Sequence, residues 1–185
     1  MSRAMVKGDN GKFEDRTFEV LHDAVVAHYT RLGFYDHATA LVQQCYALTE
    51  AGETTKAVLV NDLPEIKDGI GDILICLINW AQLESVDFMQ EYGEAKILCV
   101  SRLSPAEAVI LTHHEISNIG GVDVELYDLI ETLHILAARF DLTLADCLGC
   151  AYDVISKRKV KLLNGTLVKE ANWYKHPELE DVAEL

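Results

Sequence analysis

The segment from Leu63 to about Leu83 constrains the fold more than any other part of the chain. It opens with Leu63-Pro64-Glu65, and a proline in the first turn is typical of a helix start. On a helical wheel, the apolar side chains cluster between roughly 80° and 180° from Glu65; they are Ile66, Ile70, Ile73, Leu74, Leu77 and Ala81. The pattern predicts a long helix whose apolar face other helices must cover.

The remaining periodic segments also predict helices, and no alternating strand pattern of useful length is present. The expected helices span about 14–31, 37–60, 86–100, 105–120, 124–140 and 143–161, with one short strand at 166–168. Only three prolines occur in 185 residues, and no Gly/Ser-rich linker separates the segments. We therefore expect a single all-α domain, a helical bundle over residues 1–185, with a flexible acidic tail at 173–185.

The charge balance excludes some functions. The chain has 16 basic and 30 acidic residues, and a net charge of −14 argues against binding a nucleic-acid polymer. No apolar run reaches the roughly 18 residues that span a bilayer, so no membrane partner is expected. The N-terminal residues lack the apolar core of a signal peptide. The chain has five cysteines, an odd number that cannot all pair within it. These features predict a cytoplasmic protein with free thiols.

Two pairs of carboxylates can meet across the hairpin that joins the second and third helices. Glu50 and Glu53 are three residues apart and share a helix face, and Asp68 and Asp72 share a stripe with Glu65 and Asn79. The Asn61-Asp62 turn makes the two helices antiparallel, so the pairs come roughly level. Four carboxylates at one place repel one another unless cations lie between them, and Mg²⁺ or Mn²⁺ suits such oxygen ligands.

These residues carry a family resemblance. Residues 49–54 read TEAGET and residues 68–79 read DGIGDILICLIN, which resembles the MazG-like all-α nucleoside triphosphate pyrophosphohydrolases of phage type. Residues 151–170, AYDVISKRKVKLLNGTLVKE, are similar to the closing segment of such proteins. The resemblance covers about 37–91 and 140–172, and it implies that the segment 92–139 is a helical insertion. It also implies the bundle type of that family with additional helices.

The resemblance assigns the site residues. It implies that Glu50, Glu53 and Asp72 are catalytic metal ligands. The family's fourth ligand position falls on Gly69, which has no carboxylate, so Asp68 or Glu65 must substitute there. Thr49 stands where the family often has a further glutamate.

The resemblance further implies a function. A (deoxy)nucleoside triphosphate, with dGTP as the first candidate, would be attacked at the α-phosphorus with Mg²⁺ as cofactor. The products would be the monophosphate and pyrophosphate. Lys157 and Arg158 are expected to bind phosphates, and Asn79 to contact the nucleotide. The family's active sites imply a homo-oligomer, a dimer or a tetramer.

Three alternatives stay open on the residues alone. The acidic stripe can be a solvated helix face with no ligand. The replacement of expected acids by Gly69 and Thr49 is also compatible with a non-catalytic helical module that binds a nucleotide or a partner. Finally, Glu131 and His134 form one ExxH unit of the kind found in di-metal carboxylate bundles, which need two such units.

Overall fold

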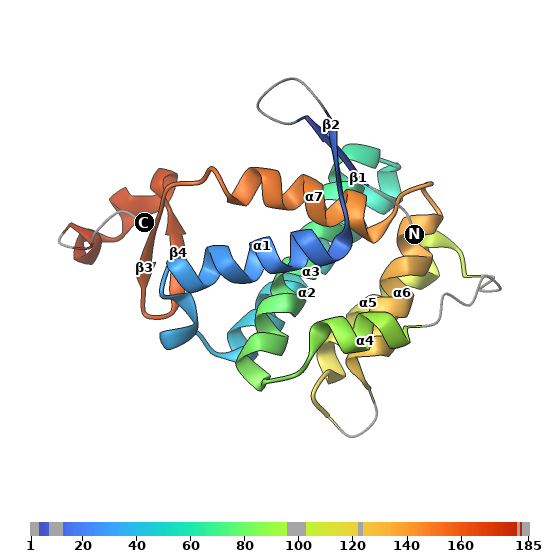
Figure 1. The fold of residues 1–185 in the computed structure, drawn as a ribbon, viewed down its shortest axis with the longest axis horizontal. Coiled ribbons are helices and arrows are strands. Elements are labelled where there is room, and N and C mark those ends of the chain that lie inside the picture. The colour runs from blue at the N-terminus through green and yellow to red at the C-terminus, as the bar shows by residue number, and fades with distance from the viewer. Residues whose placement is uncertain (1–3, 8–12, 96–102, 122–123, 181, 183–185) are drawn as a thin grey trace.

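The computed structural model describes residues 4–7, 13–95, 103–121, 124–180 and 182 (Figure 1). Its α-helices are α1 Phe18–Arg31, α2 Ala40–Val60, α3 Leu63–Glu84, α4 Phe88–Glu94, α5 Pro105–Asn118, α6 Leu126–Ala138 and α7 Leu144–Ile155. Short 3-10 helices follow at η1 Phe34–Asp36, η2 Glu170–Lys175 and η3 Pro177–Leu179. The strands form two antiparallel hairpins, β1 Ala4–Lys7 with β2 Phe13–Arg16 and β3 Val160–Leu163 with β4 Thr166–Lys169. The expected all-α class is confirmed, and no helix in these ranges is long and apolar enough to cross a membrane.

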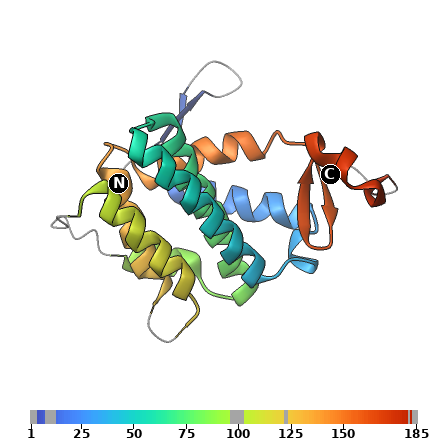
Figure 2. The ribbon, with the colours of Figure 1, turned by 180° about the vertical axis from the view of Figure 1, so that it is seen from behind.

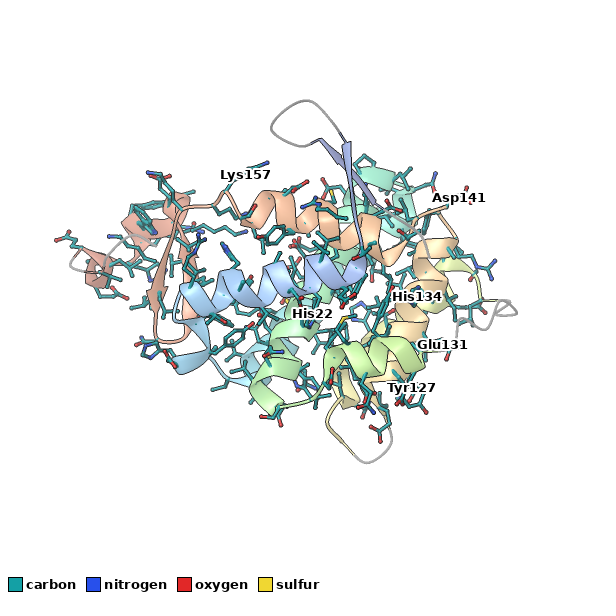
Figure 3. The ribbon with its side chains drawn as sticks, in the orientation of Figure 1. His22, Tyr127, Glu131, His134, Asp141 and Lys157 are labelled. Carbon is teal, nitrogen blue, oxygen red and sulfur yellow. The ribbon has the colours of Figure 1, made fainter. Side chains whose placement is uncertain are left out.

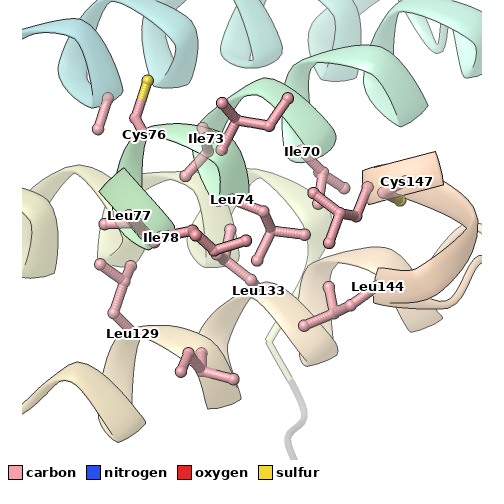
Figure 4. Close-up of a cluster of buried hydrophobic side chains, with 14 of the residues drawn as sticks. Ile70, Ile73, Leu74, Cys76, Leu77, Ile78, Leu129, Leu133, Leu144 and Cys147 are labelled. Atoms are coloured by element: carbon pink, nitrogen blue, oxygen red, sulfur yellow. The ribbon is translucent and has the colours of Figure 1, made fainter. Parts of the chain in front are cut away.

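Helix α3 is the centre of the core. The apolar side chains of its predicted buried face have no or almost no exposed surface. Helices α1, α2, α4, α6 and α7 all pack on it, and α1 and α7 run side by side across one flank (Figure 1). Figure 4 shows Ile70, Ile73 and Leu74 meeting side chains of α6 and α7, among them Leu133 and Leu144. Burial of this face accounts for the length of the helix.

Helices α2 and α3 form the antiparallel hairpin that the turn sequence predicts. Asn61 ends α2 in the left-handed region, with φ of 56°, which asparagine tolerates better than most residues. Asp62 then caps α3 by accepting a hydrogen bond from the backbone N–H of Glu65. Seen from the side opposite α1, α2 lies along α3 over most of its length (Figure 2).

Two glycines set how closely the neighbours of α3 approach it. A Cβ atom at Gly69 would collide with the side chain of Thr54 on α2, and one at Gly71 would collide with the backbone of Cys147 on α7. Gly52 of α2 differs, because a Cβ atom built there has no neighbouring atom within 4 Å. The close helix contacts are therefore made at the two glycines of α3.

The ends of the first and last helices differ from the sequence prediction. The helix expected from residue 14 begins at Phe18, because residues 13–16 pair with β1 and Thr17 caps the helix. The helix expected to reach residue 161 ends at Ile155, because Val160–Leu163 pairs with Thr166–Lys169 across the turn at 164–165. The short strand expected at 166–168 is confirmed as part of β4.

Helices α5 and α6, which lie within the segment 92–139, belong to the core. Helix α5 packs on α2, and α6 packs on α5 and α4. Ile116, Leu129 and Leu133 have no exposed surface. Glu115 lies buried between α5 and α6 and accepts a hydrogen bond of 3.0 Å from the hydroxyl of Thr132. Residues 96–100, expected to end the fourth helix, lie outside the described residues.

Residues 173–180, which belong to the segment expected to be a flexible tail, form contacts with the rest of the chain. The indole N–H of Trp173 donates a hydrogen bond of 2.9 Å to the carbonyl of Val168. The ammonium of Lys161 donates one of 2.7 Å to the carbonyl of Leu179, whose side chain is buried. These contacts fold the segment against the β3–β4 hairpin.

A pair of glycine substitutions tests the close α2–α3 contact. Gly69→Ala should lower the free energy of unfolding by about 1–3 kcal/mol, because its methyl group needs the space of Thr54. Gly52→Ala should raise it by about 0.5–1 kcal/mol, since the position is helical and open. Urea denaturation of both variants measures the difference, and equal effects would contradict the packing described.

Candidate functional site

A pocket of about 190 Å³ opens where α1, α2 and α3 meet the β3–β4 hairpin. Glu50 of α2 and Asp72 of α3 line it from one side. Arg158, just after α7, and Lys169, the last residue of β4, line it as well. The pocket thus brings two carboxylates and two cations together from four parts of the chain.

The two carboxyl groups of the pocket have raised pKa values. Burial, followed by the negative charges of Asp72 and Glu53, raises the pKa of Glu50 to about 7. Burial, followed by the charge of Asp68, raises the pKa of Asp72 to about 6, although Arg158 and Lys169 oppose the shift. The four acids of the two predicted pairs are therefore close enough to act on one another, as the hairpin geometry predicts.

The donors of this cluster suit a hard divalent cation. Glu50 and Asp72 face the pocket, whereas Glu53 is exposed and the carboxylate of Asp68 lies 4.0 Å from the Sγ atom of Cys150. Within the described ranges, no three His, Cys, Asp or Glu side chains converge as closely as a metal ion requires. Carboxylate oxygens are suitable donors for Mg²⁺, and a cation stabilises partly buried carboxylates that repel one another. Glu50 and Asp72 are the carboxylates that the pocket presents to such a cation.

Gly69 stands at the position where the family that the sequence resembles has its fourth metal ligand, and the contact between α2 and α3 fills the space there. Gly69 touches Thr54 so closely that no side chain fits between α2 and α3. Asp68 acts electrostatically on both Glu50 and Asp72, whereas Glu65 is exposed in the first turn of α3. Of the two substitutes that we considered, Asp68 is the one near the cluster.

The basic residues divide between two places. Arg158 lines the pocket, whereas Lys157 is exposed, does not line it, and lies just beyond α7 in Figure 3. Lys161 holds the C-terminal segment, with its ammonium 4.7 Å from the centre of the Trp173 ring. Lys169 was missed by the sequence analysis. Lys169 pairs with Val160 in the β3–β4 hairpin, and this pairing brings Lys169 close to Arg158, which precedes β3.

The rest of the pocket wall is aromatic and apolar. Tyr29 and Phe34 contribute, their ring centres 4.9 Å apart, together with Tyr46, Gln43 and His28. A wall of this kind suits a flat ring with polar edges. The pocket therefore has a charged part and an aromatic part.

Asn79 is buried and does not line the pocket. Its side chain has no exposed surface, and its Oδ1 atom accepts a hydrogen bond of 2.7 Å from the hydroxyl of Tyr35. Trp80 is buried in the core, and Tyr152 packs edge-on against His28. Any effect of Asn79 on a ligand must therefore pass through the tyrosines beside it.

Glu131 and His134, the ExxH unit, lie elsewhere, on α6 (Figure 3). The His134 ring lies 5.5 Å from that of Tyr92, and burial lowers the pKa of His134 to about 4. Neither residue lines the pocket.

The raised pKa values predict a pH dependence of stability. Folded Glu50 and Asp72 bind protons up to about pH 7 and 6, whereas their ordinary pKa values are 4.5 and 3.8. Between these limits the folded state binds more protons than the unfolded state, so the metal-free protein should lose stability as the pH rises from about 4 to 7. Chemical denaturation at several pH values measures this loss, and Glu50→Gln should reduce it.

Glu115 provides the control, because burial raises its pKa to about 7 at a place remote from the pocket. Glu115→Gln should also flatten the pH dependence, but Mg²⁺ should stabilise this variant as it does the unmodified protein. An unchanged slope in Glu50→Gln, or Mg²⁺ stabilisation that survives the loss of Glu50, would contradict the assignment.

Comparison of this chain with known protein families, with curated proteins and with solved structures finds no match.

Proposed function

We propose that this protein is a metal-dependent nucleoside triphosphate pyrophosphohydrolase, with a bundle of the MazG-like type. The observation that carries the proposal is the composition of one pocket. Two carboxylates with raised pKa values, Glu50 and Asp72, share it with Arg158, Lys169 and an aromatic wall. A magnesium nucleotide has the matching parts, a cation, an excess of phosphate charge and a flat base.

The carboxylates would hold the metal. Glu50 and Asp72 are the ligands proposed, and Glu53 and Asp68 add negative charge from either side. Bound there, Mg²⁺ would neutralise the triphosphate and lower the pKa of an attacking water. Because a cation binds ionised carboxylates, its binding would release protons from Glu50 and Asp72 and would strengthen as the pH rises to about 7.

The cations would hold the phosphates. Arg158 offers a planar fork of N–H donors that matches two phosphate oxygens, and Lys169 offers a single point charge. Both already lower the pKa of Asp72, so both lie within electrostatic reach of a metal held there. Their charge would favour departure of pyrophosphate as the α-phosphorus is attacked.

The substrate proposed is a (deoxy)nucleoside triphosphate, and the family resemblance makes dGTP the first to test. The same resemblance leads us to propose a homo-oligomer, a dimer or a tetramer. The odd number of cysteines leads us to propose free thiols and a cytoplasmic location.

A non-catalytic nucleotide-binding module is the second candidate. The observation that favours it is the packing of Gly69 against Thr54, which leaves no room for a carboxylate at that position. A pocket with fewer ligands could bind a magnesium nucleotide without hydrolysing it. Both candidates are expected to bind a magnesium nucleotide, but only the enzyme is expected to hydrolyse it.

The decisive assay incubates the purified protein with each of the common dNTPs and NTPs and Mg²⁺, and measures pyrophosphate. We expect release from at least one nucleotide. Asp72→Asn should lower kcat/KM about 10²- to 10³-fold, by the loss of electrostatic stabilisation. Lys169→Ala should mainly raise KM.

Glu65→Gln is the matched control, because Glu65 is an exposed acid of the same helix outside the pocket. Its activity should equal that of the unmodified protein. Nucleotide binding without pyrophosphate release, with Mn²⁺ also tried, would favour the binding module. Absence of both binding and release would refute the two candidates together.

A further inference from the structure

We propose, on the basis of the function proposed above, that Gln43 reads the edge of the nucleobase and that Tyr46 supplies the face on which the base stacks. Both residues line the aromatic part of the pocket and lie on the same face of α2 as Glu50. Neither was a candidate in the sequence analysis.

Gln43 is a buried amide without a structural role. Only 4% of the residue is exposed, it lines the pocket, and its carboxamide forms no hydrogen bond within the described part of the chain. Its neighbour Gln44 is different, since its Nε2 atom donates a hydrogen bond of 2.8 Å to the carbonyl of Ile116. The donor and the acceptor of this carboxamide are therefore available to a ligand in the pocket, and a ligand with polar edges can pair with both.

The spacing along α2 separates the base from the phosphates. Gln43 precedes Glu50 by seven residues, which is two helical turns or about 10 Å on one face. Tyr46 lies between them and is 40% exposed, so its ring is open to a ligand. A nucleotide whose phosphates lie near Glu50 would thus extend its sugar along α2 and place its base against Tyr46, with the edge of the base towards Gln43.

His28 offers a second, fixed donor in the same wall. The guanidinium of Arg31 lies 3.1 Å from the Nδ1 atom of His28, and because arginine can only donate, Nδ1 accepts. Burial and the charge of Arg31 lower the pKa of His28, so the ring is neutral and carries its proton on Nε2. The wall thus presents donors from His28 and both a donor and an acceptor from Gln43.

This set of groups matches a nucleobase. A carboxamide places a donor beside an acceptor, and so does the edge of a base, such as the O6 and N1–H of guanine. A pocket built to satisfy such an edge rejects bases that leave its polar groups unpaired. Gln43 is therefore a specificity-determining residue, and it takes no part in the chemistry at the phosphates.

Calorimetric binding of non-hydrolysable analogues of the four dNTPs, with Mg²⁺ present, tests this role. The unmodified protein should prefer one base by at least about tenfold, the effect of one or two hydrogen bonds. Gln43→Met keeps the volume and removes the polar pair, so its preference should fall to within about threefold. Gln43→Glu, which only accepts, should change which base is preferred.

Gln44→Met is the control, because Gln44 is the adjacent residue and bonds to α5 outside the pocket. It should lose stability and keep the base preference. A flat preference in the unmodified protein, or an unchanged preference in both Gln43 variants, would overturn the proposal. Selective binding without release of pyrophosphate from natural dNTPs would instead refute the enzymatic function and leave the role of Gln43 standing.

Discussion

The close antiparallel contact of α2 with α3 is the constraint on which the rest of the structure depends. Gly69 allows Thr54 to lie against the backbone of α3, and this contact brings Glu50 level with Asp72. The same contact leaves no room for a side chain at the position where the family that the sequence resembles carries a further carboxylate. A larger residue at Gly69 would separate the helices that form the pocket, so the packing of α2 on α3 and the shape of the pocket are linked.

Much of the core could be predicted from periodicity, and much of the pocket could not. The apolar face of α3 and the acidic pairs follow from spacing along single helices, so Asp72 was found from the sequence. The predicted end of α7 is wrong. The residues from Lys157 to Lys161 have good helix propensity, but residues 160–163 pair with β4 instead. Lys169 and Gln43 were missed because their place in the pocket depends on non-local packing.

Both ends of the pocket offer groups with which a ligand could pair. Burial, followed by the negative charge of neighbouring carboxylates, raises the pKa values of Glu50 and Asp72. At the aromatic end, the amide of Gln43 lacks a partner within the described residues. A cation would stabilise the ionised carboxylates, and a polar ring could pair with the amide of Gln43. The raised pKa values of Glu50 and Asp72 are a cost to the stability of the free protein at neutral pH.

The most direct test of the central claim is anomalous diffraction from crystals soaked with Mn²⁺ and a non-hydrolysable dNTP. We expect a manganese peak between the carboxylates of Glu50 and Asp72, with phosphates extending towards Arg158 and Lys169. A nucleotide bound elsewhere, with no manganese at this pair of acids, would contradict it.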